Sequence, residues 1–118
     1  MSVPALLRLW LPVVAWAGVI FALSSIPDLG TGLGTWDLVL RKLAHAAEFA
    51  VLGALLLRAL ARPLPAFALG VVYAVSDEVH QQFVEGRRGS AVDVLIDTVG
   101  VALGVLAWRR LARPEQLR

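Results

Sequence analysis

The stretch from Leu9 to Pro27 contains nineteen consecutive residues without a formal charge. A helix of that length crosses roughly 30 Å of hydrocarbon, and lipid admits only structures that satisfy their backbone hydrogen bonds internally. Composition agrees, because 58% of the residues are hydrophobic and only 17% are charged, where soluble domains carry about a quarter. A cleaved signal peptide is the disfavoured alternative, since the run is long for a signal-peptide core and only Arg8 precedes it.

Three further apolar runs follow, and each is short or interrupted by ionisable residues. Soluble core helices have similar patterns, but beside one clear span the most economical interpretation is a set of membrane-spanning helices. We therefore predict an all-α fold, a four-helix transmembrane bundle that forms a single domain over residues 1–118. The predicted spans cover roughly residues 7–26, 41–59, 63–84 and 91–109.

Basic residues are distributed unevenly about these spans. Four spans place both termini and the central loop on one side, which holds seven of the eleven basic residues and one of the nine acids. The positive-inside rule makes that side cytoplasmic, so we predict a multi-pass cell-membrane protein with cytoplasmic N- and C-termini. The polar segment VSDEVHQQFVEGRRGS is then extracytoplasmic. The same flanking bases explain the pI of about 9.9, and no nucleic-acid partner is expected.

The link from Asp28 to Leu40 is rich in glycine and is predicted to be an external loop. Its GTGLGT run superficially resembles a nucleotide-binding fingerprint, but no strand precedes it and the match is incomplete. The chain has no cysteine, which excludes disulfides, thiolate metal sites and a cysteine nucleophile. No cofactor is expected.

Ionisable residues in the last three spans fall on single helical faces, because positions three, four and seven apart share a face. The stripes are Arg41, His45, Glu48 and Leu52 with Lys42 at the margin; Gly70, Ala74, Asp77 and Gln81 with Glu78 beside them; and Asp93, Asp97, Gly100 and Gly104. The G-x-x-x-G pair of the last stripe allows another helix to approach closely, so its two aspartates are expected to face protein. Ionisable groups at membrane depth cost several kcal/mol unless paired or wetted, which favours a functional role.

Each residue also has a structural explanation. Lys42, Arg87 and Arg88 are long cations that can extend to the lipid headgroups, and Asp93 can cap the last helix. His45 taken alone is typical of a satisfied structural histidine. For the whole set, a network of ion pairs that holds short helices together is an open alternative.

The segments RKLAHAAEFAVLG and VSDEVHQQFVEGRRGSAVDVLIDTVGVALG resemble the two signature blocks of VanZ-like membrane proteins, and FALSSIP is similar to the family's Phe-x-x-Ser-Ser element. The resemblance covers most of the chain and all four spans. It implies recurring polar positions at Lys42, His45, Glu48, Asp77, Glu78, Gln81, Gly86, Arg87 and Asp93. The chain departs from the pattern at Arg41, Phe49 and Asp97, where an acid, an aromatic hydroxyl and an asparagine are common. The family's named member is associated with low-level teicoplanin resistance, which implies a role in the cell envelope.

Two functions fit these residues. The first is an intramembrane enzyme for a lipid-linked or cell-wall substrate at the outer leaflet, with a histidine as acid or base and Arg87 as an anion clamp. The second is a non-catalytic protein that binds or shields an envelope component with the same groups. Proton-coupled transport is a third and weaker hypothesis, because four helices without a visible repeat offer little for alternating access.

The candidates for catalysis or binding are His45, Glu48, Asp77 and Glu78, and the further binding candidates are Lys42, Gln81, Arg87, Asp93 and Asp97. Imidazole and carboxylate groups suit a divalent cation, and His45, Glu48, Asp77 and Asp97 supply them. No recognised metal-binding spacing supports such a site, and no metal is assigned. The expected partners are the lipid bilayer and a lipid-linked or cell-wall ligand.

Overall fold

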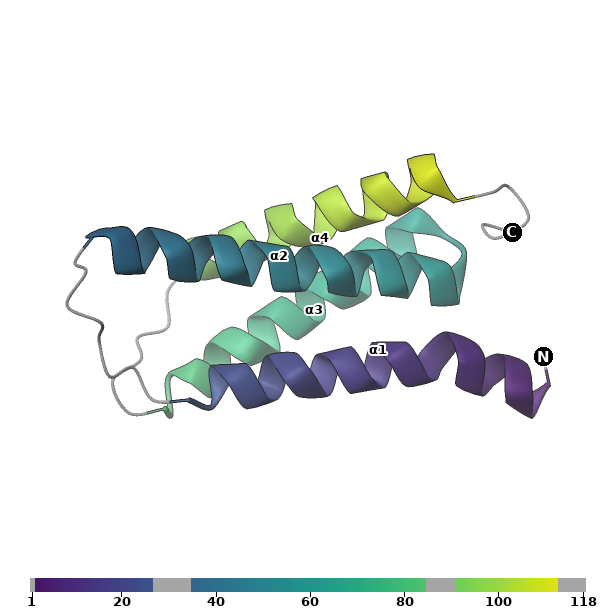
Figure 1. Cartoon of the computed structure of the whole chain (residues 1–118), viewed down its shortest axis with the longest axis horizontal. Helices are drawn as coiled ribbons and strands as arrows, with labels where there is room; N and C mark the ends of the chain where they lie inside the picture. Colours follow the sequence, from purple (N-terminus) through teal and green to yellow (C-terminus); the bar gives the residue numbers. More distant parts are fainter. Residues whose placement is uncertain (1, 27–34, 85–90, 113–118) are drawn as a thin grey trace.

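The computed structural model describes residues 2–26, 35–84 and 91–112. That part of the chain consists of four α-helices and contains no strand: α1 (Val3–Ser24), α2 (Thr35–Leu60), α3 (Pro63–Gln81) and α4 (Ala91–Leu111). The predicted all-α four-helix bundle is confirmed. The helices alternate in direction, so α2 and α4 run parallel to each other (Figure 1). Three of them, α1, α2 and α4, are long and apolar enough to cross a membrane, which makes the chain a multi-pass membrane protein.

The start of α2 differs from the prediction. The prediction of a loop up to Leu40 is wrong for residues 35–40, because these residues belong to α2. Asp37 lies in the first turn, where a carboxylate stabilises the exposed backbone N–H groups, and it forms an ion pair of 2.8 Å with Arg41 one turn later. The remainder of the predicted loop, including GTGLGT, lies outside the described residues.

The link between α2 and α3 is a tight turn. Ala61 adopts a left-handed φ of 61°, and its N–H donates to the Leu57 carbonyl at 2.7 Å, which ends α2. Arg62 is extended, as expected for a residue before proline, and Pro63 begins α3. The sequence therefore turns back within two residues, and α3 returns along the bundle antiparallel to α2 and α4.

Glycines allow α2 and α4 to pack at the closest approach in the bundle. A Cβ atom added at Gly100 would clash with the Ala46 carbonyl oxygen, and one at Gly104 with the Ala50 carbonyl oxygen. The packing predicted from the G-x-x-x-G pair is thus present, with α2 as the partner. Gly53 of α2 lies equally close to the α4 backbone. Backbone contacts at glycines of both helices therefore define how α2 and α4 are aligned along their axes.

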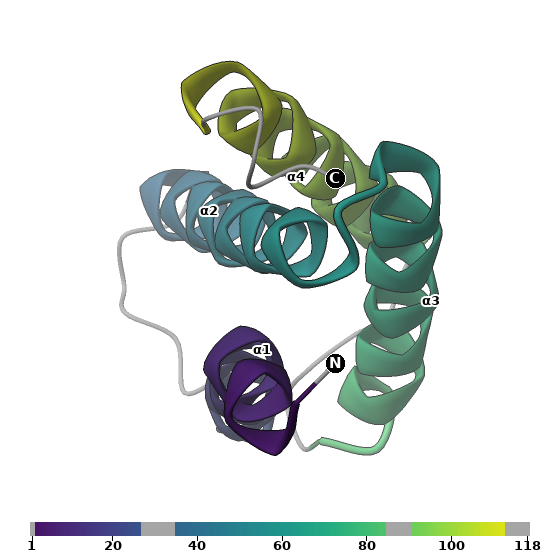
Figure 2. The same cartoon turned by 90° about the vertical axis from the view of Figure 1, so that its right-hand side faces the viewer.

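The remaining packing places α1 and α3 against this pair (Figure 2). The Trp16 indole donates to the Glu48 backbone carbonyl at 2.8 Å, and the Tyr73 hydroxyl donates to the Ala17 carbonyl. Phe49 lies at the centre of the buried core. Many large apolar side chains remain exposed on all four helices, as expected for a surface that contacts lipid.

Candidate functional site

The alternating directions of the helices bring the polar residues to one end of the bundle. The N-terminal halves of α2 and α4 and the C-terminal ends of α1 and α3 lie at the left in Figure 1. The buried polar side chains are all at this end: Ser24, Asp77, Glu78, Gln81 and Asp97. The arginines of the described helices other than Arg41 lie toward the opposite end: Arg8, Arg58, Arg62, Arg109 and Arg110. One end is therefore buried and mostly acidic, and the other is basic.

The parallel alignment of α2 and α4 pairs their polar residues in sequence order. Lys42 forms an ion pair with Asp93, and both side chains are partly buried. One turn further into the bundle, His45 Nδ1 lies 3.5 Å from Asp97 Oδ1. Gly100 follows Asp97 by one turn. The close contact of Gly100 with α2 therefore also positions the Lys42–Asp93 and His45–Asp97 pairs.

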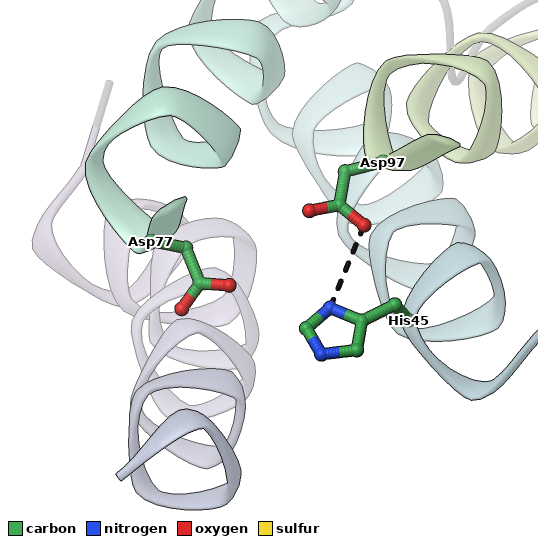
Figure 3. Close-up of side chains that lie close together, drawn as sticks. All are labelled: His45, Asp77 and Asp97. Atoms are coloured by element: carbon green, nitrogen blue, oxygen red, sulfur yellow. Dashed lines mark ion pairs between the residues drawn. The ribbon is translucent and has the colours of Figure 1, made fainter. Parts of the chain in front are cut away.

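Asp77 of α3 completes a cluster of three side chains from three helices (Figure 3). His45, Asp77 and Asp97 each offer one nitrogen or oxygen atom, and these atoms lie within 4.8 Å of one another. The two aspartates are 4% and 1% exposed, respectively, and the histidine is partly buried. Three predicted site residues that are far apart in sequence are therefore neighbours in space.

Gln81 connects this cluster to α1. Its Nε2 donates to Asp77 Oδ2 at 3.1 Å, lies 3.4 Å from His45 Nε2, and donates to Ser24 Oγ at 3.5 Å. Gln81 was predicted to have a binding role, whereas Ser24 was not among the predicted site residues. The FALSSIP element was the signal for it, since a serine pair at the end of an apolar span needs a polar partner when buried.

A second contact closes the same end between α1 and α3. The His80 ring stacks on Phe21 with 4.2 Å between ring centroids, and His80 Nε2 lies 3.3 Å from Ser25 Oγ. None of these three residues belongs to the predicted site. The stacked pair and the Gln81–Ser24 hydrogen bond hold the end of α1 beside the cluster.

The cluster does not satisfy its own hydrogen-bonding groups. Among the described residues, His45 Nδ1, Asp77 Oδ1 and Asp97 Oδ1 are buried without a hydrogen-bond partner. A buried polar atom that lacks a partner costs free energy comparable to a lost hydrogen bond. These three atoms belong to the residues that converge in Figure 3.

The other predicted site residues surround the cluster or fall outside the description. The side chain of Glu78, which follows Asp77 on α3, is buried. The side chain of Glu48, one turn beyond His45 on α2, is partly buried. Arg87, expected to be an anion clamp, lies outside the described residues, as do Gly86 and Arg88. The structure thus brings together His45, Asp77, Gln81 and Asp97 and places Lys42 and Asp93 at the margin of the same end.

No curated protein and no solved structure matches the chain. The family model for VanZ/LLP1 matches residues 9–113, which includes α1 from residue 9 onward and the whole of α2, α3 and α4. The chain is therefore a member of the VanZ/LLP1 family.

Proposed function

We propose that this protein acts on the polar headgroup of a lipid-linked or cell-wall component, in a membrane-embedded site that opens toward the extracytoplasmic side. The observation that carries the proposal is the convergence of buried polar side chains from α1, α3 and α4 and the partly buried His45 of α2 at one end of an apolar bundle. Ionisable groups are expensive at membrane depth and mark functional sites by default.

The side of the membrane follows from charge. The described arginines at the end opposite the cluster are those that the positive-inside rule places in the cytoplasm. The cluster then lies beneath the outer leaflet. His45 is ten residues from the start of α2, which corresponds to about 15 Å along the helix axis. A headgroup at the outer leaflet reaches that depth more readily than a fully soluble ligand, while its lipid chains stay against the exposed apolar surface.

The residues supply acid–base chemistry. His45 faces Asp97, which orients the imidazole as carboxylates do for catalytic histidines. Gln81 places its amide near Nε2 of the ring and donates to Asp77, which is an acceptor close to both His45 and Asp97. The imidazole is therefore held in position to exchange a proton with a hydroxyl, amine or phosphate group of the ligand.

A purely structural ion-pair network explains the cluster less well. Such a network stabilises a fold when each buried polar atom has a well-placed partner. Among the described residues, Asp77 Oδ1 has no hydrogen-bond partner, and His45 Nδ1 and Asp97 Oδ1 meet only in the 3.5 Å ion pair without forming a hydrogen bond. A bound polar ligand would satisfy those atoms. The association of the family's named member with low-level teicoplanin resistance supports the cell envelope as the source of that ligand.

Mass spectrometry of envelope lipids and wall precursors tests the proposal in a deletion strain of the native host, complemented with variants. We expect wild type to restore the precursor profile and His45→Ala and Gln81→Ala to leave it altered. Gln82→Ala is the matched control, because Gln82 is the exposed neighbour of Gln81 on the same helix end. Membrane levels and melting temperatures of all variants are compared with wild type.

Full restoration by Asp77→Asn and Glu48→Gln variants that fold normally would refute a role for the cluster and for Glu48 beside it. Purified protein then separates catalysis from binding. Conversion of a precursor over many turnovers supports chemistry at the site, whereas saturable one-to-one binding without product would replace it by a shielding function.

A further inference from the structure

We propose that His45, Asp77 and Asp97 bind one divalent transition-metal ion, with Zn²⁺ and Mn²⁺ as the ions that fit the ligand set. The proposal goes beyond the proposed function, because metal binding can be measured without knowing the substrate. It is carried by the juxtaposition of one imidazole and two carboxylates from α2, α3 and α4.

The distances suit a shared ion. Three atoms that lie no more than 4.8 Å apart are all within about 2.8 Å of a common point, which is 4.8 Å divided by the square root of three. Zn²⁺ binds imidazole nitrogen and carboxylate oxygen at about 2.0–2.2 Å. Each ligand atom therefore has to move inward by less than about 1 Å, which side-chain rotation about existing helices accomplishes.

Burial gives an independent reason to expect a cation. Asp97 is 1% exposed and forms an ion pair of 3.5 Å with His45. Its Oδ1 has no hydrogen-bond partner among the described residues, and the same holds for Asp77 Oδ1, whose side chain is 4% exposed. Figure 3 shows both carboxylates directed toward the space beside the His45 ring. Two buried carboxylates with unsatisfied oxygens that converge on one point are the arrangement that a cation stabilises.

The neighbouring cation does not fulfil this role. Lys42 forms an ion pair with Asp93, which lies one turn before Asp97 on α4. His45 carries at most a single positive charge between the two aspartates. A divalent ion would balance both carboxylates and leave the imidazole neutral, which is the form in which histidine binds metals. With the ion bound, His45 would act as a ligand in place of the proton exchange described above.

The ligand chemistry selects the kind of metal. Imidazole suits zinc, iron, nickel and copper, whereas carboxylate suits magnesium, calcium and manganese, so a mixed set favours Zn²⁺ or Mn²⁺. Calcium takes six to eight oxygen ligands, which three side chains do not provide. Three protein ligands leave at least one coordination position open for water or for a phosphate or carboxylate of a ligand.

Gln81 has the position of an outer-shell residue. Its amide donates to Asp77 Oδ2, which leaves Oδ1 of the same carboxylate available to the ion. A hydrogen bond of this kind to a metal-binding carboxylate orients the ligand, and its loss typically reduces metal affinity about 10- to 100-fold. Gln81→Ala is therefore expected to weaken metal binding, with loss of affinity smaller than that caused by removal of a ligand.

Metal analysis of the purified full-length protein in lipid nanodiscs tests the inference. After removal of metals with a chelator, the protein is titrated with ZnCl₂ or MnCl₂ alone, and bound metal is counted by mass spectrometry after dialysis and by isothermal calorimetry. We expect one ion per chain for wild type, and at least a 100-fold weaker affinity for Asp97→Asn, Asp77→Asn and His45→Ala. His80→Ala is the matched control, because His80 is the other histidine at the same end of the bundle.

Two further measurements keep the result independent of folding. The melting temperature of each variant without metal reports whether it folds, and added Zn²⁺ should raise the melting temperature of wild type and His80→Ala alone. Co²⁺ in place of Zn²⁺ should give a visible absorption band that disappears in Asp97→Asn. The inference is overturned if wild type binds no stoichiometric metal, if folded Asp77→Asn and Asp97→Asn bind like wild type, or if His80→Ala abolishes binding. Success of these tests and failure of the envelope-lipid experiment would retain the metal site and reject the proposed function.

Discussion

The contact between Gly104 and the α2 backbone gives the sharpest test of how this bundle is assembled. A Cβ atom at Gly104 would lie 2.6 Å from the Ala50 carbonyl carbon and 2.8 Å from its Cα, where ordinary contact is 3.4–4 Å. Backbone atoms cannot rotate away as a side chain does, so α2 and α4 must separate by about 1 Å. The same separation would lengthen the 3.5 Å contact between His45 and Asp97.

Gly18 of α1 is the matched control, because a Cβ atom there meets nothing within 4 Å. Replacement of either glycine by alanine raises helix propensity by about 1 kcal/mol, and overpacking of a tight contact costs typically about 1–3 kcal/mol. We therefore expect Gly104→Ala to be about 1–3 kcal/mol less stable than Gly18→Ala, since the propensity gain cancels in the comparison.

Reversible unfolding in mixed detergent micelles, followed by circular dichroism, measures this difference. A larger side chain in Gly104→Val should increase the loss, and the same substitution at Gly18 should not. Equal unfolding free energies for Gly104→Ala and Gly18→Ala would refute the argument that close backbone contact aligns α2 and α4.

Three other outcomes are expected. Because the chain has no cysteine, Trp36→Cys and Leu111→Cys provide unique labelling sites at side chains that are 71% and 83% exposed. A membrane-impermeant maleimide should label Trp36→Cys from outside intact cells and Leu111→Cys only after permeabilisation. The reverse labelling pattern would invert the proposed orientation. A double-mutant cycle on Lys42 and Asp93 should give a coupling energy of about 1 kcal/mol or more, because the pair is partly buried, and a value near zero would show that the ion pair is incidental. Tyr73→Phe should lower the unfolding free energy by about 0.5–1.5 kcal/mol through loss of its hydrogen bond to an α1 carbonyl, and unchanged stability would contradict that contact.

Much of the polar end could be predicted from periodicity. The spacing of Asp77 and Gln81 places both on one face of α3, and both are buried there. The spacing of Asp97, Gly100 and Gly104 likewise predicted that the aspartate faces protein, and it does. A hydrophobic chain leaves few surfaces on which polar groups can gather, so helical faces are readable from the residues alone.

Contacts between helices were harder to predict from the sequence. The buried Ser24 and its hydrogen bond to Gln81 were not predicted, because they depend on how far α1 extends beside α3. The predicted start of α2 was too late, because the glycine-rich sequence before it favoured a loop. The ion pair of Asp37 with Arg41 stabilises the first turns of the helix, but a single i, i+4 pair is a weak predictor of helix from sequence.

The sequence by itself determined that this chain is a helical membrane protein with four helices and that each of the last three carries its ionisable groups on one side. Only the tertiary structure decided which of those groups meet. Helical periodicity defines the direction in which a side chain points but not the relative height of two helices, and that height depends on contacts such as Gly100 against Ala46. The resulting alignment sets His45 opposite Asp97 and leaves room for Asp77 beside them.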